Sequence, residues 1–213
     1  MDEDLKNYLL QTLPKQRQWA VELEAQAKLD NVPIMDSVSV HFMMQIIRLK
    51  KPERILEIGT AIGYSALRML EAYPESSIVT IERDEKRYLQ AIENIREQNK
   101  QSSISVILGD ALEKMSELAV NGQQFDFIFI DAAKGQYHRF FELSVPLLTS
   151  NGIIISDNVL FRGHVVSPDN AHPRHKNMVG KIRKYNSMIT EHQDFTTSIV
   201  PIGDGVAISL KNS

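Results

Sequence analysis

From residue 54 onward, short apolar runs rich in β-branched residues alternate with longer segments of helical periodicity. The runs are RILEIG at 54–59, SIVTIE at 77–82, SISVIL at 103–108, FDFIFID at 125–131 and GIIISD at 152–157. The segments between them, which we predict to be helices, cover residues 64–72, 84–98, 111–120 and 137–148. Nearly continuous apolar runs are typical of parallel strands that are covered on both faces. The alternation therefore predicts a doubly wound, mostly parallel α/β sheet.

The first fifty residues are predicted to be helical and exceed what such a sheet requires. Trp19, Leu23 and Ala27 recur every four residues, as on one side of a helix. Val32-Pro33-Ile34 ends this segment, because the residue before a proline disfavours the helical conformation. We predict a further helix from Ser37 to Leu49. Its apolar side carries Val40, Met43, Met44 and Ile47.

After residue 160 the chain departs from the alternation. A polar stretch at 161–178 precedes a predicted helix around Val179–Glu191. Residues 196–211 predict two strands joined by Gly203-Asp204-Gly205, an antiparallel hairpin that brings the strands to seven. We therefore predict one domain over residues 1–213. It would consist of a helical N-terminal segment, 1–50, and an α/β core, 53–213, with an insertion at 161–184.

Composition excludes several kinds of site. The chain of 213 residues has no cysteine, which excludes disulfides, thiolate metal ligands and cysteine nucleophiles. Its net charge of −3 argues against nucleic-acid binding through bulk positive charge. No apolar run approaches the ~20 residues of a membrane span. The acidic N-terminus, MDEDLKNYLLQ, lacks a basic-then-apolar signal, so we expect a cytoplasmic protein without a membrane partner.

A small-residue loop follows the first strand at the edge where open α/β sheets bind ligands. Gly59 and Gly63 in EIGTAIGYS allow close backbone approach, and Glu82 ends the next strand, where it can accept hydrogen bonds from ribose hydroxyls. The alternative is a simple tight turn, with Glu82 capping a helix. The spacing differs from G-x-G-x-x-G, and Glu57 would repel a pyrophosphate. Both features favour a ligand with a cationic centre over a dinucleotide.

Polar residues also follow the fourth and fifth strands. Asp131 and Lys134 end the fourth, and Asp157-Asn158 ends the fifth. Two carboxylates and an amide oxygen on one edge of the sheet suit Mg²⁺. A nearby cation favours the neutral, proton-accepting form of a lysine, so Lys134 is the candidate general base. Taken singly, each residue could be a helix cap, a turn former or a surface charge; together they favour a metal site.

The loop ILEIGTAIGYSA resembles the E/D-x-G-x-G-x-G loop of class I S-adenosylmethionine-dependent methyltransferases, with Ala61 in place of the middle glycine. Gly109-Asp110-Ala111 resembles the adenine-binding turn of that family. FDFIFIDAAKGQY, followed by IIISDNVLFRGHV, resembles the divalent-metal-dependent O-methyltransferases related to catechol and caffeoyl-CoA methyltransferases. The segment VPIMDS at 32–37 resembles their N-terminal lid over the cofactor. The resemblance runs from about Val32 to Lys211.

This resemblance implies a Rossmann-like methyltransferase sheet, a homodimer and a set of site residues. It implies S-adenosylmethionine as cofactor, with binding residues Met35, Glu57, Gly59, Gly63, Ser65, Glu82, Asp110, Ala111 and Asp131. It implies Mg²⁺ or Mn²⁺ held by Asp131, Asp157 and Asn158, with Lys134 as the catalytic base. Chelation of two adjacent substrate oxygens would lower the pKa of the oxygen to be methylated. Lys134 would then remove its proton.

A basic segment after the fifth strand bears on the acceptor. Between residues 162 and 184, six Lys and Arg stand against one acid, a local charge of +5. The candidate contacts to RNA are Arg162, Arg174, Lys176 and Arg183. Such a patch beside an active site is typical of a phosphate-rich substrate, and tRNA loops expose single-stranded bases. Coenzyme A could use the same charges, and a solvated helix face is the remaining explanation. His172 and His175 are more simply solvated than metal-bound.

The motifs together resemble the bacterial tRNA 5-hydroxyuridine O-methyltransferases most closely. The matching stretches are VPIMD, ILEIGTAIGYSA, IERDEKR, FIDAAKGQY, SDNVLFRG and PIGDGVAIS. We therefore predict methylation of 5-hydroxyuridine at the wobble position of a tRNA anticodon loop. A small-molecule catechol-type or acyl-CoA O-methyltransferase with the same site residues is the alternative. A binding module that holds S-adenosylmethionine or RNA without chemistry is disfavoured, because binding alone needs no base.

Overall fold

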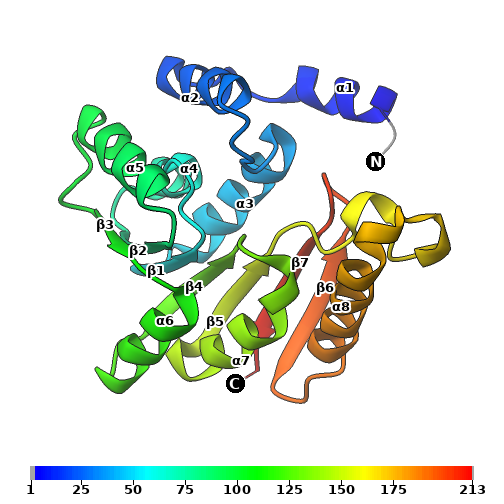
Figure 1. Cartoon of the computed structure of the whole chain (residues 1–213). Coiled ribbons are helices and arrows are strands. Elements are labelled where there is room, and N and C mark those ends of the chain that lie inside the picture. The colour runs from blue at the N-terminus through cyan, green and yellow to red at the C-terminus, as the bar shows by residue number, and fades with distance from the viewer. Residues whose placement is uncertain (1–2, 213) are drawn as a thin grey trace.

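The computed structural model describes residues 3–212 and contains a seven-stranded sheet with helices on both faces (Figure 1). The strand order is β3-β2-β1-β4-β5-β7-β6. The strands are β1 (Arg54–Ile58), β2 (Ser77–Glu82), β3 (Ile104–Leu108), β4 (Phe125–Ile130), β5 (Leu148–Ser156), β6 (Phe195–Val200) and β7 (Val206–Lys211). The first five strands pair in parallel, and β7 is antiparallel to β5 and β6. The predicted sheet and its C-terminal hairpin are confirmed.

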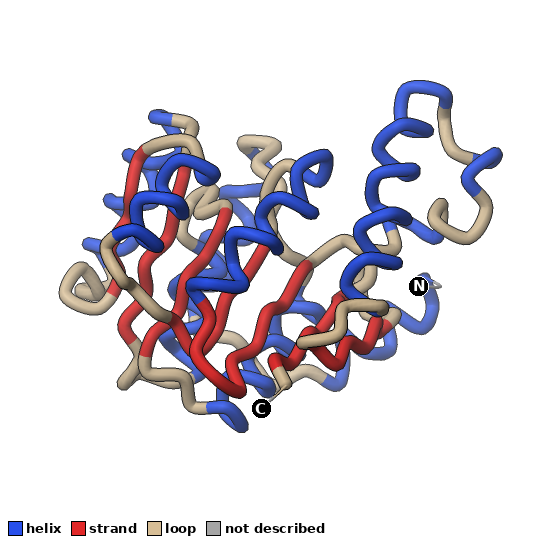
Figure 2. The backbone as a smooth tube through the Cα atoms, turned by 90° about the horizontal axis from the view of Figure 1, so that it is seen from below, coloured by secondary structure: helices blue, strands red, loops and turns tan. Residues whose placement is uncertain are grey.

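Helices cover the sheet in two layers, as the view from below also shows (Figure 2). They are α1 (Glu3–Thr12), α2 (Gln18–Leu29), α3 (Ser37–Lys50), α4 (Tyr64–Ala72), α5 (Glu85–Glu97), α6 (Ala111–Val120), α7 (Tyr137–Leu147) and α8 (Pro173–Thr190). The predicted N-terminal helices are present, and α1 and α2 contact α3 and α4 (Figure 1). Within residues 3–212, none of these helices has the length and apolarity that crossing a bilayer requires.

Alternation along the strands divides the apolar side chains between two cores. In β4, Phe127 and Phe129 join the core formed with α3 and α4, whereas Ile128 and Ile130 join the core formed with α6, α7 and α8. All four side chains are fully buried. Successive residues of a strand point to opposite faces, so a strand with apolar residues at every position must be covered on both. The central strands therefore lie between two helical layers and form a rigid base for the site at their carboxyl ends.

Aspartates begin the helices that border this end of the sheet. Asp36, Asp84 and Asp110 are the N-caps of α3, α5 and α6. Asp84 accepts a hydrogen bond from the backbone N–H of Arg87 at 2.9 Å, and Asp110 accepts one from Leu112 at 2.9 Å. A carboxylate at the N-cap satisfies an unpaired N–H group and interacts favourably with the helix dipole. The caps determine where each helix begins and hence how the loops before it are positioned.

Two predicted boundaries near the end of the chain differ from the structure. β5 begins at Leu148, four residues before the apolar run, because Phe125 pairs with Leu148 across an irregularity in the ladder. α8 begins at Pro173, six residues before the predicted start, with His172 as its N-cap. Proline is well tolerated in the first turn of a helix, since its missing N–H would have no helical partner there. The second half of the predicted insertion at 161–184 is therefore part of α8, and its first half contains the short 3₁₀ turns η2 (Phe161–Gly163) and η3 (Pro168–Asn170).

The close approach of two strand ends depends on Gly59. This residue has φ of +101°, and a Cβ atom there would lie 2.2 Å from the backbone oxygen of Asp131. Such a contact is far inside van der Waals distance, and backbone atoms cannot rotate away. Only glycine therefore allows the loop after β1 to pass this close to the end of β4.

We predict that Gly59→Ala lowers the free energy of unfolding by about 3 kcal/mol or more, because strain at positive φ adds to a backbone clash. Gly122→Ala is the matched control, since Gly122 has φ of +66° but a Cβ atom there would meet nothing within 4 Å. Its expected loss is about 1 kcal/mol, from backbone strain alone. Urea unfolding followed by circular dichroism measures both. Equal losses would contradict the role given to the close approach.

Candidate active site

The carboxyl ends of the parallel strands open into one cavity, whose wall also includes the connection between α2 and α3. Most of the predicted site residues line it: Met35, Gly59, Ser65, Glu82, Asp110, Ala111, Asp131, Lys134, Asp157 and Asn158. They come from segments separated by more than one hundred residues of sequence. Convergence at the carboxyl ends of strands is the general position of ligand sites in open α/β sheets.

Backbone groups orient the carboxylate of Glu82 at the cavity. Its Oε2 accepts a hydrogen bond from the N–H of Ala61 at 2.8 Å, which ties it to the glycine loop. Its Oε1 accepts from the N–H groups of Arg83 and Asp84 at 3.0 and 2.9 Å. Asp84, rather than Glu82, is the N-cap of α5. Glu82 therefore connects the loop after β1 to the turn after β2, and its buried side chain lines the cavity.

Glu57 and Gly63 lie behind the cavity wall. Glu57 is fully buried and accepts hydrogen bonds from the hydroxyls of Ser65 and Thr80. Burial raises its pKa to about 8, and these two hydrogen bonds oppose the shift. Gly63 is the N-cap of α4, and a Cβ atom there would lie 3.6 Å from Ala91 of α5. Both residues therefore support the cavity wall from behind, and Glu57 does so through Ser65. Their part in cofactor binding stays a prediction.

The turn after β5 holds two of the predicted metal ligands. The N–H of Asp157 donates to Ile130 of β4, and Asn158 has φ of +60°. Three side chains support this turn from α7 and α8. Tyr137 donates to the carbonyl of Asp157 at 3.0 Å, Asn186 donates to the carbonyl of Val159 at 2.8 Å, and Tyr185 and Ser156 share a hydrogen bond. The sequence analysis identified none of these supports.

The electrostatics of Asp131 and Asp157 are those of two carboxyl groups that repel each other. Burial is the largest cause that raises the pKa of Asp157 to about 8, followed by repulsion from Asp131. The pKa of Asp131 is also raised by burial, and the positive charge of Lys134 opposes this shift. Two neighbouring buried carboxylates cannot both ionise at low cost unless a cation lies between them.

The donor set fits a hard divalent cation. Asp131, Asp157 and Asn158 offer carboxylate and amide oxygens from two adjacent strand ends, and oxygen ligands are what Mg²⁺ and Mn²⁺ prefer. A cation would also neutralise the repulsion that raises the carboxyl pKa values. Across residues 3–212, no three side chains of His, Asp or Glu are grouped as metal ligands. A metal here would therefore depend on the amide of Asn158 and on water or substrate to complete its coordination.

A second cavity adjoins the first and shares part of its wall. Pro33, Ile34, Lys134 and Asn158 line both. The other residues of the second cavity include the positively charged Lys6, Arg162 and Arg174, together with His164 and His175, and two acids, Asp36 and Asp204. The second cavity therefore lies beside Lys134 and carries more positive than negative side chains.

Two of the four predicted RNA contacts line this second cavity, and two do not. Arg162 and Arg174 line it, whereas Lys176 and Arg183 are exposed elsewhere on α8. Lys176 lies 3.8 Å from Asp169. The pKa of His175 is lowered, first by burial and then by neighbouring positive charges, among which Arg174 is the largest. The cations of this cavity are close enough to influence one another.

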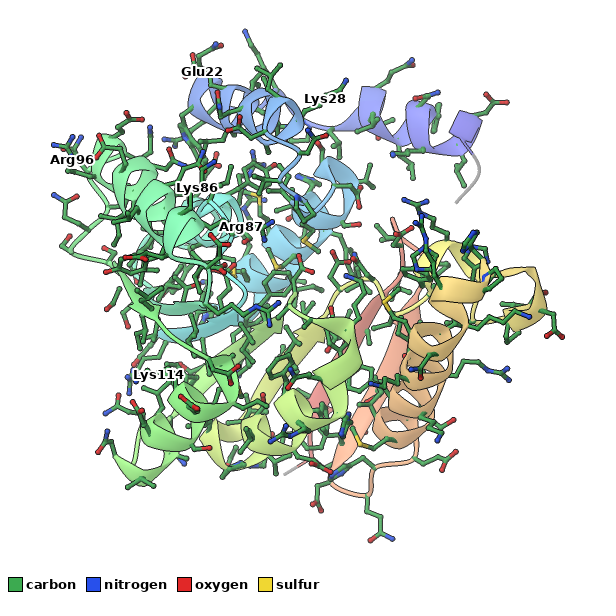
Figure 3. All side chains as sticks on the ribbon, viewed as in Figure 1. Glu22, Lys28, Lys86, Arg87, Arg96 and Lys114 are labelled. Atoms are coloured by element: carbon green, nitrogen blue, oxygen red, sulfur yellow. The ribbon has the colours of Figure 1, made fainter. Side chains whose placement is uncertain are left out.

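The sequence analysis did not identify several residues of the two cavity walls. Tyr64, Arg87, Gln136 and Phe140 line the first cavity. Arg87, labelled in Figure 3, follows the end of β2 and could have been found by the same strand-end argument as Glu82. Lys6 reaches the second cavity from α1, which the sequence places far from every strand. Only the packing of α1 brings it there.

Comparisons with known proteins show the family of the chain. The sequence profile of the O-methyltransferase family matches residues 15–212. A putative caffeoyl-CoA O-methyltransferase of Arabidopsis thaliana is 29% identical over 215 residues, which cover 97% of this chain and 92% of that protein. A catechol O-methyltransferase of Niastella koreensis is 30% identical over 176 residues, which cover 79% of this chain and 78% of that protein.

Solved structures extend the similarity to the whole fold. A putative caffeoyl-CoA O-methyltransferase from Staphylococcus aureus has a TM-score of 0.92 and 36% identity, and the match covers 99% of this chain and all of that one. An O-methyltransferase from Bacillus cereus in complex with SAH has a TM-score of 0.86 and 26% identity, and covers 98% of this chain and 97% of that one. The chain therefore belongs to the S-adenosylmethionine-dependent O-methyltransferase family that includes the caffeoyl-CoA and catechol enzymes.

Proposed function

We propose that this chain transfers the methyl group of S-adenosylmethionine to one of two adjacent oxygens of an acceptor, with a divalent cation held by Asp131, Asp157 and Asn158. The observation that carries the proposal is the placement of Asp131, Asp157 and Asn158 beside Lys134, in the cavity that also contains Glu82 and Asp110. Neither a cofactor-binding module nor a structural protein needs a lysine beside a cation site.

In this proposal the chain's residues orient the two reactants. Glu82 and Asp110, at the ends of β2 and β3, bind the adenosine part of the cofactor, and Met35 supplies an apolar contact from the α2–α3 connection. A divalent cation held by Asp131, Asp157 and Asn158 would lower the pKa of the acceptor hydroxyl and fix its position. Lys134 lines both cavities and accepts the hydroxyl proton at its Nζ atom. The oxygen then attacks the methyl carbon, and the bond from that carbon to sulfur breaks.

The relatives favour a small acceptor with two adjacent oxygens. Their names include caffeoyl-CoA, catechol and flavonoid methyltransferases. Caffeoyl and catechol groups carry such vicinal hydroxyls, so a catechol-type or acyl-CoA acceptor is the class with most support. The comparisons thus favour the alternative of the sequence analysis over a tRNA substrate.

One observation supports 5-hydroxyuridine in tRNA as a second candidate. The second cavity contains Lys6, Arg162 and Arg174 beside Lys134, and such a cationic wall suits an acceptor that carries phosphates. The O4 and O5 atoms of 5-hydroxyuridine form a chelating pair like that of catechol. Coenzyme A, which is also phosphorylated, satisfies the same observation.

We predict that Lys134→Ala lowers kcat by about 10²–10⁴-fold, the usual contribution of a general base, while the Kd for S-adenosylmethionine is retained. Isothermal titration calorimetry and a methyl-transfer assay measure the two quantities. Lys28→Ala is the control, because Lys28 is exposed on α2 (Figure 3). Unchanged turnover in Lys134→Ala would remove this lysine from the mechanism.

We predict that EDTA abolishes activity and that Mg²⁺ or Mn²⁺ restores it. Because the folded pKa of Asp157 is raised from 3.8 to about 8, folding without metal takes up a proton. The contribution of Asp157 to the free energy of unfolding is fully present below pH 3.8 and is lost as the pH rises toward 8. Metal binding requires the ionised form, so added Mg²⁺ should raise Tm more at pH 8.5 than at pH 6. Activity that is indifferent to chelation would contradict the metal site.

The requirement for two oxygens can be tested with matched acceptors. We predict methyl transfer to catechol or caffeoyl-CoA and at least about 10²-fold less to phenol or coumaroyl-CoA, which lack the second oxygen. Equal rates would exclude chelation of two oxygens.

The tRNA candidate predicts a specific cellular change. A strain that lacks the gene should lose 5-methoxyuridine and accumulate 5-hydroxyuridine, as measured by mass spectrometry of tRNA nucleosides. Complementation with Arg162→Ala/Arg174→Ala should restore less 5-methoxyuridine than the unchanged gene, because these cations line the second cavity. Unaltered nucleosides in the deletion strain would remove the tRNA candidate and leave the small acceptors.

A further inference from the structure

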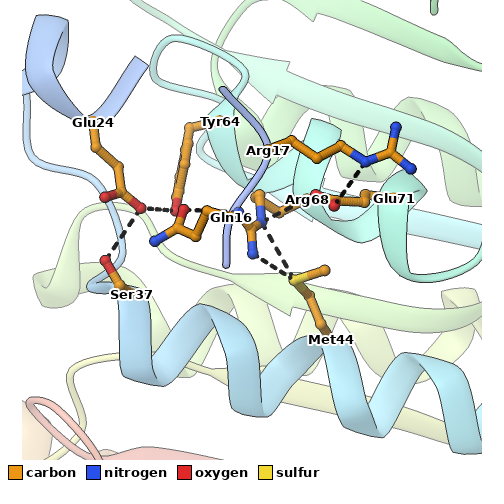
Figure 4. Close-up of polar contacts among 8 residues, drawn as sticks. All are labelled: Gln16, Arg17, Glu24, Ser37, Met44, Tyr64, Arg68 and Glu71. Carbon is orange, nitrogen blue, oxygen red and sulfur yellow. Dashed lines mark hydrogen bonds and ion pairs between the residues drawn. The ribbon is translucent and has the colours of Figure 1, made fainter. Parts of the chain in front are cut away.

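Glu24 of α2 accepts two hydrogen bonds that cross between helices (Figure 4). Its Oε1 atom accepts from the hydroxyl of Tyr64 and from Oγ of Ser37, the latter at 3.1 Å. Burial is the largest cause that raises the pKa of Tyr64, followed by its bond to Glu24, so the phenol stays protonated and remains a donor. One carboxylate therefore joins α2, α3 and α4.

Both donors are next to the wall of the first cavity. Tyr64 is the first residue of α4, is 1% exposed and lines that cavity. Ser37 is the first residue of α3 and follows the segment 32–36, which we call the cover segment. Pro33, Ile34 and Met35 of the cover segment also line the cavity. The carboxylate of Glu24 thus connects two parts of the wall that are far apart in sequence.

The neighbouring polar contacts have a different placement. Arg68 donates to Oε1 of Gln16 at 2.9 Å and lies 3.4 Å from Glu71, which also lies 3.2 Å from Arg17 (Figure 4). These contacts attach the connection between α1 and α2 to the middle of α4. Their residues are outside the wall of the first cavity, in contrast to Tyr64 and the cover segment. Arg68 also lies over the ring of Tyr64, 6.0 Å from its centroid, but it has no hydrogen bond to the cover segment or to Ser37 among the contacts described. Of the hydrogen bonds in Figure 4, those of Glu24 are therefore the ones that join Tyr64 to the residue after the cover segment.

We propose that Glu24 is a positioning residue for S-adenosylmethionine: it holds Tyr64 and the cover segment in the arrangement that encloses the cofactor. The proposal rests on the assignment of the first cavity to the cofactor. Hydrogen bonds to a carboxylate are stronger than those between neutral groups. Without them the cover segment gains conformational freedom, which cofactor binding must then remove. Removing these hydrogen bonds therefore lowers the affinity for S-adenosylmethionine, whereas the wall of the cofactor-bound protein is ordered by the cofactor itself.

The test compares binding with turnover in Glu24→Ala. We expect Kd and KM for S-adenosylmethionine to rise by roughly 5–30-fold, the equivalent of losing one or two hydrogen bonds to a charged group. At saturating cofactor, kcat should stay within about twofold, because the groups that transfer the proton and methyl are intact. Glu24→Gln should recover part of the affinity, since its amide oxygen still accepts both hydrogen bonds. Hydrogen exchange in residues 32–36 should accelerate in the cofactor-free Glu24→Ala protein.

Matched controls separate this role from general effects of charge and packing. Glu22→Ala removes a carboxylate from the same helix, where Glu22 bonds only to Gln18 among the contacts described (Figure 3). Tyr73→Phe removes a tyrosine–glutamate hydrogen bond at the exposed end of α4. Both controls should leave Kd unchanged. Tyr64→Phe should weaken binding, and its effect should not add to that of Glu24→Ala, because both remove the same contact.

The outcomes separate the proposal from the assignment on which it rests. If the unchanged protein does not bind S-adenosylmethionine, the cofactor assignment fails. If it binds and Glu24→Ala binds equally well, or if kcat falls as much as affinity, the positioning role is wrong. Additive effects of Glu24→Ala and Tyr64→Phe would also overturn it. Should Glu24→Ala fail to fold, Ser37→Ala removes a single hydroxyl from the cluster and must still raise Kd.

Discussion

The parallel hydrogen-bond ladder of β1, β4 and β5 is the constraint on which the site depends. The ladder continues one residue beyond the strands: Asp131 donates its N–H to Ile58, and Asp157 donates its N–H to Ile130. Each acidic residue is therefore held by the strand beside it rather than by a flexible loop. Apolar side chains on both faces of the same strands prevent the ladder from shifting, because a slip by one residue would turn each set toward the wrong core.

This rigidity explains why carboxyl groups that repel each other when ionised remain together. Glu57, Asp131 and Asp157 all have raised pKa values, with burial as the largest cause in each case. A flexible loop would relax and separate them, whereas strand ends cannot. Lys134 opposes the shift at the two aspartates and leaves part of the repulsion uncompensated. The proposed cation would compensate the rest, because its positive charge would lie between the two carboxyl groups.

The strands and the residues at their carboxyl ends could be predicted from the sequence because both follow from local pattern. Apolar runs specify buried strands, and the residue after each run lies at the ligand-binding edge, which locates Glu82, Asp131 and Asp157. The direction in which a polar side chain within a strand points could not be predicted in this way. Glu57 alternates toward α4 and is buried under Ser65. Lys6 and Glu24 were missed because they reach the site through helix packing, which involves no local motif.

The two cavities are not independent, because the cover segment forms part of both walls. Pro33 and Ile34 line both, while Asp36, at the end of the same segment, caps α3 and lines only the second. At Gly203 a Cβ atom would lie 2.2 Å from Oδ2 of Asp36, so the tip of the β6–β7 hairpin fits closely against this cap. The cover segment is held at one end by Asp36 and Ser37 and faces both cavities. The entropy cost of ordering it therefore arises only once, whichever cavity is filled first. With the cofactor in the first cavity and the acceptor in the second, as proposed, the ligand that orders this segment first would lower the entropy cost for the second, and the two binding events would be coupled through these few residues.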